Sequence, residues 1–177
     1  MGRLFAVVGP SGAGKDTLMA AACLQRPDLH MLRRVITRPE AAGGEDFEGV
    51  SEAEFLRRKA AGEFALDWQA HGLRYGVALP AGGTRGGDVM FNCSRAVLPR
   101  AQAMFPALVV VLVTAPAPVL AARLAARGRE APVDIEARLT RAGFALPEVR
   151  DLRRVENDAT PTLGVARFLA AVQPDRG

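Results

Sequence analysis

A glycine-rich segment near the N-terminus constrains the fold of this chain more than any other part of the sequence. It lies between a short apolar run at 4–8, which suits a buried strand, and a stretch at 15–25 with helical character. Its residues are Gly9, Pro10, Ser11, Gly12, Ala13, Gly14, Lys15, Asp16 and Thr17. The spacing of glycines and lysine is that of a P-loop, in which backbone N–H groups and a helix N-terminus face phosphate oxygens. The sequence therefore predicts a phosphate-binding loop in which Lys15 reaches the terminal phosphates.

The residue after the lysine departs from the usual P-loop pattern. A serine or threonine hydroxyl normally ligates Mg²⁺ there, whereas this chain has Asp16. An aspartate is also a hard-oxygen ligand, so we expect Asp16 to bind Mg²⁺ directly or through water. The two apolar strands that follow lead to Asn92 and Thr114 rather than to the usual metal-associated aspartate. Asp16 is therefore the best candidate for a compensating carboxylate, and Thr17 keeps a hydroxyl beside the loop.

Apolar runs alternate with helical stretches along most of the chain. Runs at 89–91 and 108–113 precede helical patterns at 95–104 and 118–127, and a closing helix is expected at 161–172. This alternation predicts an α/β fold with a parallel core sheet and helices on both faces. We expect residues 1–177 to form one P-loop domain.

Residues 37–80 interrupt the alternation and are expected to form an inserted acceptor-binding subdomain. Within them, Ser51 followed by Glu54 is a capping box that begins a helix, with Gly62 as its stop. The segments 66–70 and 73–77 predict two paired short strands.

Composition narrows the class of ligand. The 177 residues carry a net charge of +4, and lysine occurs only at positions 15 and 59, so nearly all basic groups are arginine. Two interpretations stay open: a genome that favours arginine codons, and an anionic ligand whose phosphate oxygens pair with the guanidinium fork. Aromatic residues are only 6%, with one Trp and one Tyr, and no dense basic run occurs, which argues against nucleic acid as a partner.

Hydropathy and cysteine usage exclude other classes. The longest aliphatic run, 107–113, is far shorter than the roughly 20 residues of a membrane span, and the N-terminal apolar run is too short for a secretory signal. We therefore expect a cytoplasmic protein that does not bind membranes. Two cysteines and two histidines provide neither a disulfide framework nor a structural metal cluster. Protein partners cannot be predicted from the sequence.

Three arginines predict a mobile cover for the phosphate loop. Arg123 and Arg127 are four residues apart on one helix face, and Arg138 follows a glycine and proline break, on a second helix from about residue 134. Such a lid at 123–140 can close over a triphosphate and neutralise the transferring group. A solvated basic face is the alternative interpretation.

The sequence shows no signature of a catalytic base, and this favours a phosphate group as the acceptor. A hydroxyl acceptor usually needs a positioned carboxylate, and no catalytic-loop signature of a hydroxyl kinase occurs. A phosphate monoester, with a second pKa near 6, is already a dianion at pH 7. A phosphate acceptor held by Arg38, Tyr75 and neighbouring groups fits better.

The chain resembles the guanylate kinase branch of the nucleoside monophosphate kinases over nearly its whole length. The matching segments are 9–15, Thr37-Arg38, 51–55, Asp67-Trp68, Tyr75-Gly76, 123–128, 135–139 and Asn157-Asp158. The resemblance implies ATP as co-substrate with Asn157 near its adenine. It also implies an acceptor phosphate on Arg38 and Tyr75, and a lid with Arg123, Arg127 and Arg138.

One departure from that branch concerns the substrate. The Asp-x-Asp that helps to fix guanine is replaced by Asn92-Cys93-Ser94, followed by Arg95, so donors of a guanine base would stay unpaired. Together with Lys-Asp-Thr at 15–17 and Tyr-Gly-Val at 75–77, this pattern is similar to the ribose 1,5-bisphosphate phosphokinase family.

That family uses ATP to phosphorylate the 1-phosphate of ribose 1,5-bisphosphate, giving 5-phosphoribosyl 1-diphosphate in bacterial phosphonate breakdown. The resemblance implies that Arg38 and Tyr75 hold the 1-phosphate and that Ser94 joins the substrate site. From charge alone, we expect Arg95 or Arg34 to hold the 5-phosphate. A guanylate-type nucleoside monophosphate kinase and a non-catalytic guanylate-kinase-like interaction module remain as alternatives. The intact loop lysine and glycines disfavour the module.

Overall fold

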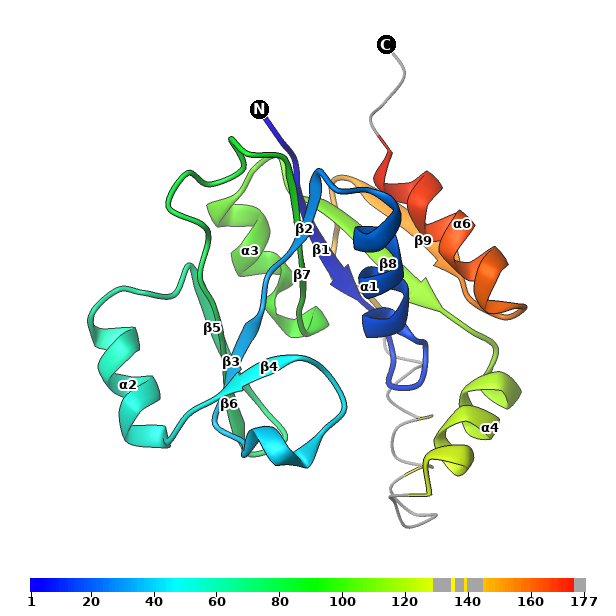
Figure 1. The fold of residues 1–177 in the computed structure, drawn as a ribbon, viewed down its shortest axis with the longest axis horizontal. Coiled ribbons are helices and arrows are strands. Elements are labelled where there is room, and N and C mark those ends of the chain that lie inside the picture. Colours follow the sequence, from blue (N-terminus) through cyan, green and yellow to red (C-terminus); the bar gives the residue numbers. More distant parts are fainter. Residues whose placement is uncertain (129–134, 136–138, 140–144, 174–177) are drawn as a thin grey trace.

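A computed structural model describes residues 1–128, 135, 139 and 145–173 of the chain (Figure 1). The elements, in chain order, are β1 (Leu4–Val8), α1 (Lys15–Gln25), β2 (Leu29–Met31), β3 (Arg34–Ile36), η1 (Glu40–Ala42), β4 (Phe47–Gly49), α2 (Glu52–Ala60), β5 (Leu66–Ala70), β6 (Leu73–Val77), β7 (Asp88–Asn92), η2 (Arg95–Val97), α3 (Leu98–Met104), β8 (Val109–Thr114), α4 (Ala117–Arg127), β9 (Leu152–Glu156) and α6 (Pro161–Val172). The helix expected to begin near residue 134 starts outside the described residues. Within the described part of the chain, none of the helices has the length and apolar character needed to cross a membrane.

The core is a five-stranded sheet in the order β2-β7-β1-β8-β9, and every pairing in it is parallel. In this register Val7 of β1 lies beside Asn92 of β7. The carboxyl ends of β1, β7 and β8 therefore meet at one edge of the sheet, which is where parallel α/β sheets bind ligands. The predicted α/β class with a parallel sheet is confirmed.

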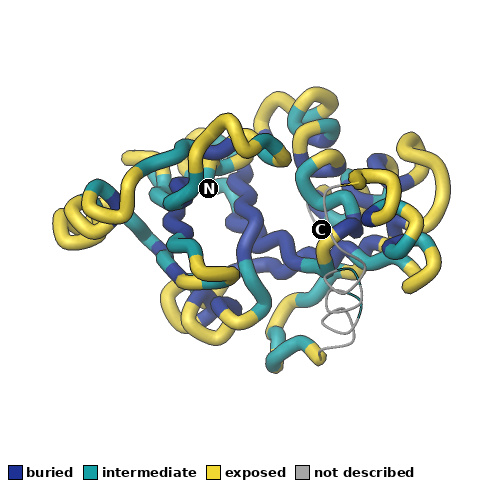
Figure 2. The backbone as a smooth tube through the Cα atoms, turned by 90° about the horizontal axis from the view of Figure 1, so that it is seen from below, coloured by how far each residue is buried: buried dark blue, intermediate teal, exposed yellow. Residues whose placement is uncertain are grey.

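The two faces of the sheet are covered differently because successive side chains of a strand point to opposite sides. Leu4, Ala6 and Val8 pack in one hydrophobic cluster with α3 residues and with the second sheet described below. Phe5 and Val7 pack in another, with residues of α1 and α6. Figure 2 shows the buried residues, in dark blue, in the interior of the molecule.

A second sheet, in the order β4-β3-β6-β5, stands with α2 beside the core sheet (Figure 1). Strands β5 and β6 form the expected pair, and the pairing is antiparallel. The capping box is present, because the Ser51 hydroxyl accepts a 3.1 Å hydrogen bond from the backbone N–H of Glu54. Gly62, with φ of +74°, follows the end of α2. This sheet places residues of β3 and β6 opposite the P-loop.

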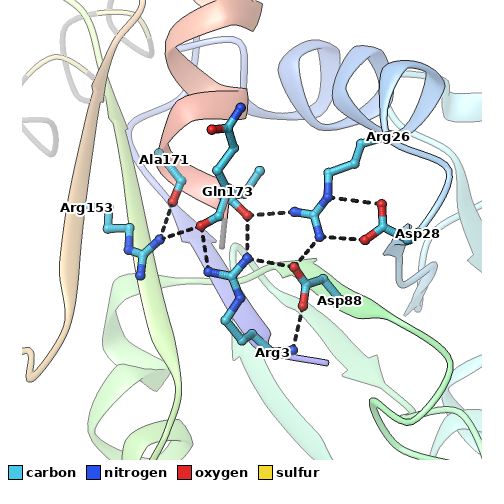
Figure 3. Close-up of polar contacts among 8 residues, drawn as sticks. Arg3, Arg26, Asp28, Asp88, Arg153, Ala171 and Gln173 are labelled. Carbon is cyan, nitrogen blue, oxygen red and sulfur yellow. Dashed lines mark hydrogen bonds and ion pairs between the residues drawn. The ribbon is translucent and has the colours of Figure 1, made fainter. Parts of the chain in front are cut away.

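The end of α6 is attached to the opposite edge of the core sheet by arginines (Figure 3). Arg3 and Arg26 each donate to the carbonyl oxygen of Val172, at 2.7 and 2.6 Å, and both pair with the Asp88 carboxylate. Burial by itself would raise the pKa of Asp88, but hydrogen bonds from the two guanidinium groups outweigh it and lower the pKa to about 2. These contacts satisfy carbonyl groups that a helix C-terminus leaves unpaired.

Candidate active site

The P-loop connects β1 to α1, and its glycines are required by close packing. Gly14 precedes α1 with φ of +86°, and a Cβ there would lie 2.7 Å from the side-chain nitrogen of Asn157. A Cβ at Gly9 would lie 2.1 Å from the carbonyl oxygen of Val113 in β8. Larger residues at either position would push the loop away from the sheet edge, so the tight curve of the backbone depends on both glycines.

Lys15 is folded onto the loop that it follows. Its ammonium group donates to the carbonyl oxygen of Gly9 at 2.7 Å and to that of Pro10 at 3.2 Å. Burial lowers the pKa of Lys15 to about 8, although the neighbouring Asp16 carboxylate opposes this change. A poorly solvated cation held at this place has a strong electrostatic preference for a phosphate partner.

Two predicted site residues support the loop from behind. Arg123 of α4 donates to the carbonyl oxygens of Gly12, at 3.1 Å, and of Asn157, at 2.5 Å. The buried side-chain amide of Asn157 donates to the carbonyl oxygen of Ala13 at 2.8 Å. Both side chains therefore contact the protein backbone of the loop, and neither lines the cavity in front of it.

A cavity of about 760 Å³ lies between the P-loop and the second sheet. The predicted site residues among its lining are Gly9, Pro10, Ser11, Gly12, Gly14, Lys15, Asp16, Thr17, Arg34, Arg38, Tyr75, Ser94, Arg95 and Arg127. Ala13 is fully buried behind the loop. Arg138, and with it much of the expected lid at 123–140, lies outside the described residues. Of the described residues, five cationic side chains, those of Lys and Arg, and two carboxylates line this cavity, so this lining favours a polyanion.

Arg38 and Tyr75 form the wall opposite the P-loop. The Arg38 guanidinium lies 4.4 Å from the ring centre of Phe47 and donates to the carbonyl oxygen of Gly43 at 3.0 Å. Its Nε is buried and has no hydrogen-bond partner among the described residues. Since an unpaired buried donor costs about 1–3 kcal/mol, this group favours an anionic acceptor nearby. Burial raises the pKa of the Tyr75 hydroxyl, which stays a donor at neutral pH.

The sequence prediction left out two residues of this wall. Glu45 lines the cavity and binds Arg34 through two hydrogen bonds, one of them at 2.9 Å. Arg34 in turn lies 5.1 Å from the ring centre of Tyr75. Trp68 is buried as expected of a core residue, but it also lines the cavity and stacks on Tyr75 with ring centres 5.5 Å apart. For Glu45, the only local signal is an acidic side chain directly after two glycines.

The expected metal ligand makes a specific contact across the sheet edge. Asn92, the last residue of β7, donates from Nδ2 to Oδ1 of Asp16 at 2.9 Å. Asp16 and Thr17 present carboxylate and hydroxyl oxygens to the same cavity as Lys15. Among the described residues, no group of three or more His, Cys, Asp or Glu could hold a metal ion without other ligands. The donors fit Mg²⁺, which commonly binds one or two carboxylates together with substrate phosphates.

Cys93 follows Asn92 and also lines the cavity. It is 4% exposed, and burial raises the pKa of its thiol to about 12. The thiol is therefore protonated at neutral pH and is a poor nucleophile.

Comparison with known proteins finds related sequences and structures. No family model matches the chain. It is 48% identical to a ribose 1,5-bisphosphate phosphokinase PhnN of Ruegeria sp. (strain TM1040), across 99% of this chain and 94% of the relative. The corresponding protein of Rhizobium etli (strain CIAT 652) is 47% identical, across 90% of this chain and 83% of the relative.

Two further similarities concern architecture. A bifunctional ribose 1,5-bisphosphokinase-thymidine phosphorylase of Cupriavidus necator is 49% identical across 97% of this chain, which matches 29% of that longer protein. Among solved structures, a guanylate kinase from Anaplasma phagocytophilum superposes with a TM-score of 0.69 at 18% identity, covering 97% of this chain and 84% of that one. At that identity the likeness shows a shared fold.

Proposed function

The chain belongs to the ribose 1,5-bisphosphate phosphokinase family, and on this basis we propose that it transfers the terminal phosphoryl group of ATP to the 1-phosphate of ribose 1,5-bisphosphate. The products are 5-phosphoribosyl 1-diphosphate and ADP, and the reaction serves phosphonate breakdown. One observation carries the proposal within this structure. A single cavity has the P-loop and Lys15 on one side and Arg38, with its buried unpaired Nε, on the other.

On the nucleotide side, the P-loop binds the phosphates of ATP. Its backbone N–H groups and the N-terminus of α1 face the phosphate oxygens, and Lys15 moves from its carbonyl partners to the terminal phosphates. Arg127 also lines this cavity and neutralises charge on the transferring group. Arg138, on the second half of the lid at 123–140, is proposed to join it.

On the acceptor side, the subdomain at 37–80 holds the sugar bisphosphate. Arg38 and the Tyr75 hydroxyl bind the 1-phosphate, and Ser94 with Arg95 or Arg34 binds the more distant 5-phosphate. An oxygen of the 1-phosphate forms a bond to the terminal phosphorus of ATP, while the bond from that phosphorus to the bridging oxygen of ADP breaks. The attacking phosphate is a dianion at pH 7, so no base is needed. The protein contributes alignment and positive charge.

Asp16 is proposed to hold Mg²⁺, directly or through water, together with the ATP phosphates, and Thr17 is proposed to contact the α-phosphate. When bound, Mg²⁺ neutralises charge on the phosphate oxygens and helps to orient them. The residues themselves place one carboxylate and one hydroxyl at the first turn of α1, beside Lys15.

An ADP-release assay with ribose 1,5-bisphosphate and GMP, each at matched concentrations, tests the proposal. We expect faster turnover of the sugar bisphosphate, and analysis of the product should show a diphosphate at C1. Faster turnover of GMP would assign the chain to guanylate-type nucleoside monophosphate kinases. Lack of any binding of ATP in the presence of Mg²⁺ would favour a non-catalytic interaction module.

A further inference from the structure

We propose that Asn92 is a positioning residue, which fixes the Asp16 carboxylate for the complex of Mg²⁺ with nucleotide. In a common P-loop arrangement, a hydroxyl follows the loop lysine and a carboxylate stands at the end of a neighbouring strand. Here the carboxylate follows the lysine, and the strand end carries an amide. The inference rests on the proposed use of ATP, and it adds a residue to that site.

The backbone holds both partners in fixed places. Asn92 pairs with Val7 in the parallel sheet, and the next residue, Cys93, donates its backbone N–H to the carbonyl oxygen of Val7 at 3.1 Å. Asn92 is 7% exposed. Asp16 lies in the first turn of α1, directly after the loop. The 2.9 Å bond from Nδ2 to Oδ1 therefore joins two rigid elements that are 76 residues apart in the chain.

The bond restricts the carboxylate before the metal arrives. A carboxylate on the first turn of a helix otherwise samples several rotamers, and fixing one of them costs conformational entropy when a ligand binds. An ionised carboxylate has about four acceptor positions, so one oxygen can accept from Asn92 while acceptor capacity remains for a cation. A ligand held in this way by a neighbouring hydrogen bond binds metal more tightly than an unsupported one.

The same distance explains why the strand end carries an amide. A carboxylate in place of the Asn92 amide would lie within hydrogen-bond distance of Asp16, and two like charges so close in a partly buried site repel each other. An amide supplies a donor and adds no charge. With Asp16 after the lysine, Asn at the strand end is therefore the residue that supports the carboxylate without competing with it.

A double-mutant cycle measures this coupling. The proteins are the wild type, Asn92→Ala, Asp16→Ala and the double variant. Calorimetry gives the affinity of each protein for a non-hydrolysable ATP analogue, with and without Mg²⁺. The affinity with Mg²⁺ divided by the affinity without it is called the Mg²⁺ gain. We expect Asn92→Ala to reduce this gain by roughly fivefold to tenfold when Asp16 is present, and by less than about twofold in the Asp16→Ala background.

Other outcomes separate a positioning role from a structural one. An equal loss in both backgrounds, or a loss that is the same with and without Mg²⁺, would overturn the proposal. Thermal unfolding checks that each variant is folded, and Asn92→Ser replaces Asn92→Ala if the latter is not. Intact binding of the analogue by the wild type without coupling would reject this inference alone. Absence of nucleotide binding in the wild type would instead reject the proposed function.

A pair of donor-removing variants provides the matched control. Asn92→Leu should reduce the Mg²⁺ gain by about fivefold to tenfold, because it keeps a side chain of similar size and removes the donor to Asp16. Gln102 of α3 is equally buried, at 7% exposed, and its amide donates to the carbonyl oxygen of Glu148 at 2.9 Å, away from the cavity. Gln102→Leu should lower stability and leave the Mg²⁺ gain within about twofold of the wild type. Similar Mg²⁺ gains in Asn92→Leu and the wild type would contradict the proposal.

Discussion

The side-chain amide of Asn157 donates a 2.8 Å hydrogen bond to the carbonyl oxygen of Ala13, a residue 144 positions earlier in the chain. Through this bond the segment after β9 supports the P-loop, although it contributes nothing to the cavity lining. The expectation that Asn157 lies near adenine remains a prediction, and the structure adds a supporting role for its amide.

Replacement of Asn157 should therefore affect both the fold and nucleotide binding. Asn157→Ala leaves the buried carbonyl oxygen of Ala13 without this donor, so we expect a loss of about 1–3 kcal/mol in the free energy of unfolding. Urea unfolding without nucleotide measures the loss, and calorimetry should show weaker binding of an ATP analogue. The exposed amide of Gln25 is the control, since Gln25→Ala should change neither quantity. Unchanged unfolding of Asn157→Ala would argue against the supporting role.

Lys15→Met should abolish phosphoryl transfer and stabilise the nucleotide-free protein. The pKa of Lys15 is lowered to about 8 in the fold, against 10.5 for a free lysine. Between these pH values the unfolded chain binds a proton that the folded chain releases, so wild-type stability rises with pH. At neutral pH, removal of the buried charge should therefore add up to about 3 kcal/mol.

Melting temperatures of both proteins from pH 7 to 10.5 test whether the charge of Lys15 destabilises the fold. The advantage of Lys15→Met over the wild type should shrink as the pH rises through this range. Lys59→Met is the control and should not show this stabilisation, because Lys59 is exposed on α2 and pairs with Asp67. A wild type and a Lys15→Met variant with parallel pH profiles would show that Lys15 is not destabilised by burial.

Asp88→Asn should weaken the attachment of α6. With its pKa lowered to about 2 from 3.8, the Asp88 carboxylate contributes roughly 2 kcal/mol of stability at pH 7. This contribution is present above about pH 4 and is lost as the pH falls toward 2. Urea unfolding at pH 7 should show the full loss, and the difference from the wild type should vanish near pH 2. Asp28→Asn, at an exposed partner of Arg26, should cost far less.

Arg38→Lys should impair binding of the acceptor and spare binding of ATP. A lysine keeps the charge but cannot present two parallel N–H groups to a phosphate. We expect KM for ribose 1,5-bisphosphate to rise by about tenfold or more, with the affinity for an ATP analogue within about twofold of the wild type. Arg100, exposed on α3, provides the control variant Arg100→Lys. An unchanged KM would remove Arg38 from the acceptor site.

Strong local patterns predicted much of the fold. The apolar run of β1, the helix α1 and the hairpin strands β5 and β6 have the expected bounds. The strands that were missed are short or polar. Strands β2, β3 and β4 have three residues each, too few to show a period, and only Val155 is buried in β9. Their pairing is decided by neighbouring strands rather than by their own sequence.

The candidate site was predictable where one segment carries the chemistry, and less so where distant segments meet. The P-loop spacing could be recognised locally, and so could the arginines that are proposed to bind phosphates. The contacts of Arg123 with Gly12, and of Asn92 with Asp16, join residues 111 and 76 positions apart. Sequence spacing alone does not show which end of a long side chain meets a backbone carbonyl. The assignments of individual residues to phosphates remain predictions.

The position of Arg123 has a mechanical consequence. Its main chain belongs to α4, whereas its guanidinium donates hydrogen bonds to the backbone of the phosphate loop and to the carbonyl oxygen of Asn157. A change in the tilt of α4 would therefore displace these carbonyl oxygens and the loop backbone that carries them. In the same way, a displacement of the loop backbone would be transmitted to α4 through the Arg123 side chain.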